Sequence, residues 1–211
     1  VIYTQQGLDG APAVLLDPNT LSPDGTTKLS VFSVSANGRL AVYGLSQGGS
    51  DWMEYRVLDV ATRQPREDVV QWVKVSGAAW AGDGFFYSRY PAPTGGKDLS
   101  AKNVNHEVYF HKVGTPQAAD EKVFSDPANP ERFHTVEVTE DERFLILTVS
   151  DRGKGKKGNA VFYRDLAVKD SAFRPIVGEI GDDTFTVVDN IGATFLVYTD
   201  RKAPNGRVFL F

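Results

Sequence analysis

The chain contains 211 residues and carries a formal net charge of −4, with 41% hydrophobic and 11% aromatic residues. This composition is typical of a globular protein with a hydrophobic core. The negative charge argues against nucleic acid as the main partner, because phosphate binding requires a basic surface. No apolar run reaches the roughly 18 residues of a transmembrane helix, so no membrane contact is expected. The absence of cysteine excludes disulfides and thiol chemistry, and leaves the cytoplasm and the bacterial periplasm open as compartments.

The first strands are expected at residues 1–4 and 13–16, on either side of a turn-forming stretch. Residues 30–60 then read as three strands separated by a tight turn and a polar loop, without helical periodicity. Within this region Asn37-Gly38 predicts a hairpin with a primed turn, because both residues tolerate positive φ.

The same order of strands and turns recurs along the chain. The predicted turn positions 38, 84, 142 and 192 are separated by 46, 58 and 50 residues, and an insertion at 91–105 explains the longest interval. A repeat of about 40–50 residues with about four short strands is typical of a β-propeller blade. The sequence therefore predicts an all-β propeller of about four to five four-stranded blades, with partial blades at 1–27 and 184–211 and whole blades at about 30–75, 76–134 and 135–183.

Such a number of blades fits two arrangements. The first and last pieces can share a blade in a small closed ring, or the chain can be an arc of a larger propeller. We favour the arc because the chain is expected to begin and end inside a blade.

One segment matches a catalytic motif. Gly44-Leu45-Ser46-Gln47-Gly48 fits the G-x-S-x-G pattern, in which serine lies on a strained turn between a strand and a helix. A strand is expected after this segment instead of a helix, so we interpret it as a glycine-rich hairpin loop.

The remaining polar clusters predict no catalytic nucleophile, base, metal site or cofactor. His106, His111 and His134 do not assemble the three or four convergent ligands that zinc requires, and surface or hydrogen-bonded structural roles are expected. A lysine and glycine run at 153–158 lacks the ending of a phosphate-binding loop and is interpreted as a solvated turn; its lysines are Lys154, Lys156 and Lys157. Core packing between blades is expected of the aromatic residues at strand spacing, Phe85, Phe86, Phe110 and Phe162.

Several stretches resemble the propeller of the prolyl oligopeptidase family. They are LLDPNTLSPDGTTKLSVFSVSANGRLAVYGLSQGGSDW at 15–52, VKVSGAAWAGDGFFYSRYPAP at 73–93, EVYFHKVGT at 107–115 and YTDRKAPNGRVFLF at 198–211. The resemblance implies a seven-bladed propeller joined to an α/β-hydrolase domain that cleaves short peptides after proline by serine acyl transfer. The propeller would be a lid and size filter, and the catalytic domain would lie outside these 211 residues.

The resemblance also implies five cavity-facing residues. Val75 and Phe133 match apolar pocket positions, Arg152 matches a basic residue near the amino-terminal side of the substrate, and Gly155 and Asp51 match neighbouring positions. Val75 replaces a residue that is usually Phe, so the pocket is expected to be wider there. Other roles remain open: a solvated turn charge for Arg152, ordinary packing for Val75 and Phe133, and a turn cap for Asp51.

The expected function is thus the lid of a prolyl-specific serine endopeptidase, with short proline-containing peptides and the hydrolase domain as partners. The insertion at 91–105 is expected to gate substrate entry. Two alternatives stay open: a free-standing propeller that binds proteins, and the lid of a related peptidase with basic or dipeptidyl specificity.

Overall fold

The computed structural model describes residues 1–93, 102–153 and 155–211, and the regular secondary structure of these residues is almost entirely antiparallel β-sheet. A hairpin opens the chain, and three groups of four strands and one of three strands follow. The hairpin consists of β1 (Ile2–Thr4) and β2 (Ala13–Leu16), and the first group of β3 (Thr27–Val34), β4 (Leu40–Gln47), β5 (Met53–Asp59) and β6 (Pro65–Val73).

The second group contains β7 (Ala79–Ala81), β8 (Gly84–Arg89), β9 (Glu107–Lys112) and β10 (Glu121–Phe124). The third contains β11 (Phe133–Val138), β12 (Phe144–Ser150), β13 (Asn159–Asp165) and β14 (Arg174–Val177), and the last β15 (Phe185–Ile191), β16 (Thr194–Thr199) and β17 (Arg207–Leu210). Two single-turn 3₁₀ helices, η1 (Pro18–Thr20) and η2 (Gln117–Ala119), lie in the connections.

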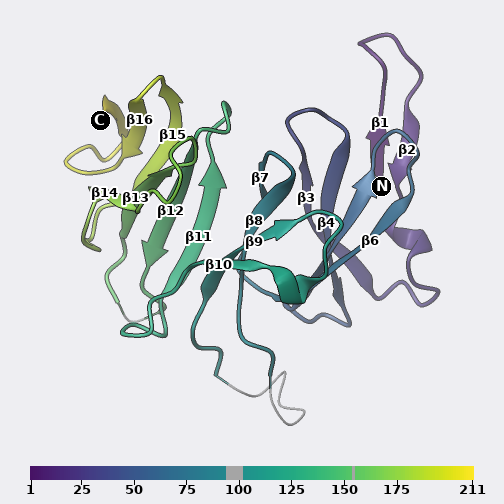
Figure 1. Cartoon of the computed structure of the whole chain (residues 1–211), viewed down its shortest axis with the longest axis horizontal. Coiled ribbons are helices and arrows are strands. Elements are labelled where there is room, and N and C mark those ends of the chain that lie inside the picture. Colours follow the sequence, from purple (N-terminus) through teal and green to yellow (C-terminus); the bar gives the residue numbers. More distant parts are fainter. Residues whose placement is uncertain (94–101, 154) are drawn as a thin grey trace.

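The groups stand side by side in an open arc (Figure 1). The hairpin at the N-terminus and the β15–β17 sheet at the C-terminus lie at opposite sides of the molecule, so the ring does not close on itself. The all-β propeller arc is therefore confirmed, and the small closed ring is wrong. The residue bounds of individual blades, with partial blades at 1–27 and 184–211, stay a prediction. In the described residues no helix is long and apolar enough to span a membrane.

The predicted hairpin at Asn37-Gly38 forms, but its turn is not of the primed type. Only Gly38 has positive φ, at 68°. The Asn37 Oδ1 atom accepts hydrogen bonds from Arg39 N and Ser35 Oγ, both at 3.0 Å, which stabilises a longer connection between β3 and β4. The local side-chain hydrogen bonds, rather than two positive φ angles, define this turn.

The repeat recurs in three dimensions with one correction. In the β11–β12 turn, Asp141 Oδ1 accepts from Arg143 N at 3.0 Å and from Thr139 Oγ1 at 2.7 Å, which reproduces the bonding of the β3–β4 turn. In the second group the positive-φ turn residue is Gly82 rather than the predicted Gly84. Gly84 instead begins β8, where a Cβ would lie 2.2 Å from the carbonyl oxygen of His111, so close packing requires glycine there.

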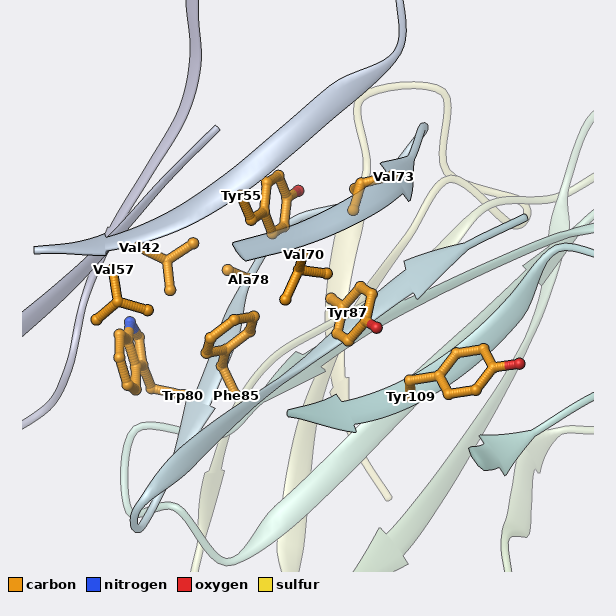
Figure 2. Packing of buried hydrophobic residues seen from close by; sticks show 10 residues of the cluster. All are labelled: Val42, Tyr55, Val57, Val70, Val73, Ala78, Trp80, Phe85, Tyr87 and Tyr109. Carbon is orange, nitrogen blue, oxygen red and sulfur yellow. The ribbon is translucent and has the colours of Figure 1, made fainter. Parts of the chain in front are cut away.

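Apolar side chains between neighbouring groups form the core. Figure 2 shows the cluster between the first and second groups, where Tyr55, Phe85 and Tyr87 are almost completely buried. The indole Nε1 of Trp80 donates to Ser33 O at 3.1 Å, so a polar bond joins the two groups within this apolar layer. Each fully buried aromatic side chain contributes about 1.5–3 kcal/mol, so the packed layers hold the sheets in fixed relative positions. The expected core roles are confirmed for Phe85 and Phe86, which are buried, and for Phe110 and Phe162, which pack partly buried against the next cluster.

Candidate wall at one end of the arc

The five residues expected to face a cavity lie at one end of the sheets. The connections that follow β4, β6 and β8 leave at this end, because Val73, the last residue of β6, pairs with Met53, the first residue of β5, and with Arg89, the last residue of β8. Phe133 begins β11 opposite Ser150, the last residue of β12, and the next residue, His134, donates its backbone N–H at 2.9 Å to Nδ1 of His106, directly before β9, which brings the third group to the same end. In the part of the chain that the structure describes, these connections lie on one side of the arc, opposite the turns at 35–39 and 139–143 (Figure 1). We call this set of connections the wall.

The first part of the wall is a charged and aromatic cluster around Val75. Asp51 pairs with Lys74, with 2.6 Å between Oδ2 and Nζ, and the Lys74 ammonium lies 4.9 Å from the Trp52 ring centroid. Val75 is 43% exposed and has a φ of 54°. Positive φ is costly for a β-branched residue, by about 1–3 kcal/mol, and such strain is concentrated at functional sites.

Tyr90 connects the two halves of the wall, and sequence reasoning missed it. Its ring packs edge-on against Trp52, with 6.0 Å between centroids. Burial raises the pKa of Tyr90, the positive charge of Arg152 lowers it, and the negative charge of Asp51 raises it. Both charges therefore lie close enough to this phenol to influence its ionisation.

The second part of the wall is formed by Phe133, Arg152 and Gly155. The Arg152 guanidinium lies 5.8 Å from the Phe133 ring centroid and donates through Nη1 to Asn103 O at 3.0 Å. Arg152 and Gly155 line one side of a cleft of about 310 Å³, whose other side is the connection at 128–132. A Cβ on Gly155 would lie 2.0 Å from Asp151 Cβ, so only glycine fits this position.

Two buried histidines lie behind the wall. His106 and His134 are each 1% exposed. The His106 ring contacts Tyr90, with 4.7 Å between centroids, and Phe133, with 5.8 Å. Burial lowers the pKa of His106 to about 4 and also lowers that of His134, so both rings are neutral at pH 7.

The third histidine, His111, lies elsewhere, and its surroundings favour the protonated form. His111 is 0% exposed and contacts Asp120 Oδ1 through Nδ1 at 2.7 Å and Asp68 Oδ1 through Nε2 at 3.1 Å. Burial lowers the pKa of His111, but the hydrogen bonds and charges of Asp120 and Asp68 raise it more, to a net value above the ordinary one. All three histidines are thus buried and hydrogen-bonded: the structural role is confirmed, and the surface role is wrong.

Among its described residues, the wall brings no serine, histidine and acidic side chains together in a hydrogen-bonded catalytic set. Ser46 lies inside β4 rather than in the hairpin loop that we expected, and its hydroxyl is 3.1 Å from that of Ser30. In the described parts of the chain no group of three or more histidine, cysteine, aspartate or glutamate residues could hold a metal ion. Of the expected lysine turn, Lys154 is outside the described residues, as is most of the predicted gate, at 94–101.

The structure thus brings the five predicted residues together in two neighbouring clusters. Asp51 and Val75 belong to the first, and Phe133, Arg152 and Gly155 to the second. The residues missed by sequence reasoning are Trp52, Lys74, Tyr90 and His106. Trp52 and Lys74 directly adjoin Asp51 and Val75 in the sequence, so they could have been predicted as wall residues from their neighbours. Tyr90 and His106 lie at strand ends, and no other feature of the sequence indicates their role.

Comparison with known proteins identifies the family. A family model described as the prolyl oligopeptidase N-terminal β-propeller domain matches residues 1–211. The prolyl endopeptidases of Elizabethkingia meningoseptica and Elizabethkingia miricola are 39% and 38% identical to this chain over 209 residues, which is 99% of the chain and 29% of each relative.

Solved structures agree with this result. A chain from a structural study of two prolyl endopeptidases superposes with a TM-score of 0.83 at 32% identity, covering 95% of this chain and 28% of that chain. Prolyl oligopeptidase B from Galerina marginata, bound to a 25-residue macrocyclization substrate, superposes with a TM-score of 0.85 at 26% identity, covering 97% and 30%. The chain spans less than a third of the length of these relatives. By the family match over its whole length and its identity to curated relatives, this chain belongs to the prolyl oligopeptidase family, as its N-terminal β-propeller domain.

Proposed function

We propose that this chain is the non-catalytic propeller lid of a serine endopeptidase that hydrolyses short peptides after proline. In this proposal the chain belongs to a longer protein, whose α/β-hydrolase domain supplies the serine, histidine and aspartate that act on the peptide. The propeller excludes folded proteins from the cavity, and the wall contacts the peptide upstream of the proline.

The observation that carries the proposal is the convergence of the five predicted positions on one end of the arc. They come from the connection after β4, the connection after β6, the start of β11 and the connection after β12, yet Tyr90 and His106 link them through contacts at 4.7–6.0 Å. A wall with aromatic surface, exposed carboxylates and guanidinium groups can bind a peptide, and its described residues include no activated nucleophile to cleave one.

The relatives support the same conclusion. The two Elizabethkingia relatives, which match 99% of the chain, are named prolyl endopeptidases, and they are about three times as long as this chain. A peptide substrate is bound to the structural relative from Galerina marginata. We infer that this chain also works next to a bound peptide.

The first test compares the 211-residue chain with its full-length parent on a chromogenic peptide ending in proline. Hydrolysis by the parent alone is expected, because the chain contains no catalytic set among its described residues. Hydrolysis by neither would favour a protein-binding scaffold instead, and hydrolysis by the chain alone would refute the lid assignment.

The second test asks whether the wall contacts the peptide. Asp51→Asn is compared with Asp83→Asn, which removes an equally exposed carboxylate paired with a lysine at the other end of the arc; the exposed fractions are 71% and 66%. Arg152→Gln is compared with Arg143→Gln, which likewise removes an arginine stacked on a phenylalanine.

We expect Asp51→Asn to raise KM for peptides with a basic residue upstream of proline, and Arg152→Gln to raise KM for peptides with an acidic one. The change should be about two- to fivefold, the size of a solvent-exposed charge pair. The two variants at the other end of the arc should leave KM unchanged. Equal effects of all four substitutions would contradict a wall that contacts the peptide.

A further inference from the structure

His106 lies where three groups of strands meet behind the wall. It directly precedes β9 in the second group. Its Nε2 contacts Lys74 O at 2.9 Å, in the connection that leaves the first group, and its Nδ1 accepts from His134 N at 2.9 Å, in the third group. One imidazole therefore bridges backbone atoms that are 32 and 28 residues away in the sequence.

The chemistry of these partners defines the state of the ring. A backbone N–H can only donate, so Nδ1 of His106 must carry a lone pair; a carbonyl can only accept, so Nε2 must carry the proton. The partner of His134 also defines its tautomer: its Nδ1 lies against the carbonyl of His106, so Nδ1 carries the proton and donates. A protonated His106 would place a second donor against His134 N, which is consistent with its lowered pKa of about 4.

The partners of His106 are also the neighbours of the predicted wall residues. The carbonyl it binds belongs to Lys74, next to Val75, and its ring packs against Phe133 and Tyr90. Val75 is held at a φ of 54°, a conformation that requires support from its surroundings. The bond to the preceding carbonyl provides such support.

We propose that His106 is a positioning residue of the wall, which fixes the spacing between the Val75 flank and the Phe133 flank through its neutral Nε2–H tautomer. The inference rests on the proposed function, since the spacing matters only if a peptide binds there. His106 is buried and does not touch the peptide; it acts through Val75, Tyr90 and Phe133. No residue assigned by resemblance to the family has this role.

Two amide substitutions each remove one of the two hydrogen bonds of the His106 ring and keep the other. The Asn side chain places its oxygen near the position of Nδ1, so His106→Asn keeps the acceptor for His134 N and releases Lys74 O. The Gln side chain places its nitrogen near the position of Nε2, so His106→Gln keeps the bond to Lys74 O and leaves His134 N without an acceptor. Thr139→Val is the matched control, because it removes the hydroxyl that accepts from Phe144 N at 3.0 Å in the sheet of the third group, at the end opposite to His134.

Hydrogen exchange and kinetics of the full-length parent protein test the proposal. His106→Asn should speed amide exchange in residues 74–78 and leave the amide of His134 protected, and His106→Gln should do the reverse. Both variants should raise KM for proline-containing peptides by about three- to tenfold with kcat within about twofold, as expected for the loss of one buried hydrogen bond that supports binding. Thr139→Val should leave KM unchanged.

Two results would overturn the proposal. The first is exchange that rises equally at both flanks in both variants, and the second is an equal rise in KM for Thr139→Val. In the unmodified protein, ¹⁵N spectra near neutral pH should show a neutral His106 with its proton on Nε2; a charged ring or an Nδ1 proton would also refute it. If the parent does not hydrolyse peptides at all, the proposed function fails, whereas the exchange and tautomer results still decide whether His106 joins the two flanks.

Discussion

Replacing His111 by Gln should destabilise the propeller more than any exposed substitution, because it removes the cation between two buried carboxylates. His111 lies in β9 and contacts Asp68 of β6 and Asp120 of the connection before β10, and all three side chains are at most 2% exposed. Tyr87 Oη also donates to Asp120 Oδ2 at 2.6 Å. A glutamine amide can replace one N–H contact but not the charge or the second contact.

The magnitude follows from the cost of a buried charge without its partner. Removal of one member of a buried ionic group costs about 3–5 kcal/mol, since the remaining charges stay desolvated. For a domain of about 150–250 residues, each kcal/mol shifts the melting temperature by about 2–4 °C, so we expect a decrease of about 6–20 °C. An exposed pair such as Asp83 with Lys112 is worth about 0–1 kcal/mol, which makes Asp83→Asn a suitable control.

The pH dependence has a definite sign. The pKa of His111 is raised in the folded state, so its contribution is fully present below the unfolded value of about 6.5 and is lost as pH rises through the folded value. The native protein should therefore lose stability on the alkaline side of pH 6.5, and His111→Gln should not show this loss. Asp120→Asn removes the closer carboxylate, so it should shift the loss to lower pH.

Calorimetry of the propeller transition between about pH 5 and 9 measures both effects, and hydrogen exchange in β6 and β9 locates them. The reasoning would be refuted by a His111→Gln variant that matches Asp83→Asn in melting temperature. It would equally be refuted by a variant that keeps the alkaline loss of stability of the native protein.

Two further substitutions test the local geometry. Gly155→Ala should destabilise the propeller by about 1–3 kcal/mol in thermal unfolding, because the added Cβ would lie 2.0 Å from Asp151 Cβ. Gly77→Ala is the control, since a Cβ there meets open space and should leave the melting temperature unchanged; equal melting temperatures of the two variants would contradict the clash. Ser46→Ala should leave the peptide turnover of the full-length protein within about twofold, because Ser46 is buried in β4 with its hydroxyl next to Ser30; loss of turnover would restore the serine motif as a catalytic element.

The repeat that defined the fold was readable from the sequence because it depends on local chemistry. The turns at Asn37 and Asp141 are both closed by a short side chain that accepts from the amide two residues later. The prediction placed the second turn at Gly84 instead of Gly82. Gly82 is required by its positive φ and Gly84 by close packing, and the sequence alone does not distinguish these two reasons for a glycine. That distinction depends on His111, which is distant in the sequence and adjacent in space.

Of the wall residues, only those implied by the family resemblance were predicted, and the residues that connect the two parts of the wall were missed. Tyr90 and His106 border the insertion at 91–105, and nothing in their local pattern separates them from ordinary strand-end residues. Their contacts join connections from three groups of strands, so they depend on the curvature of the arc rather than on any local periodicity.

His106 and His111 show why residue type and spacing alone could not assign these roles. They lie five positions apart, both are buried, and both bridge neighbouring groups of strands, yet one is neutral and the other charged. Their partners account for the difference: a carbonyl and an amide complete the two nitrogens of His106 without charge, whereas two carboxylates require a proton on each nitrogen of His111. In the described residues, backbone contacts join the first two groups of strands where Val73 pairs with Arg89 and where Tyr90 N donates to Trp72 O at 3.1 Å. Buried aromatic layers supply most of the attraction between them, and directional polar contacts of this kind then specify one relative position out of the many that apolar packing alone would tolerate.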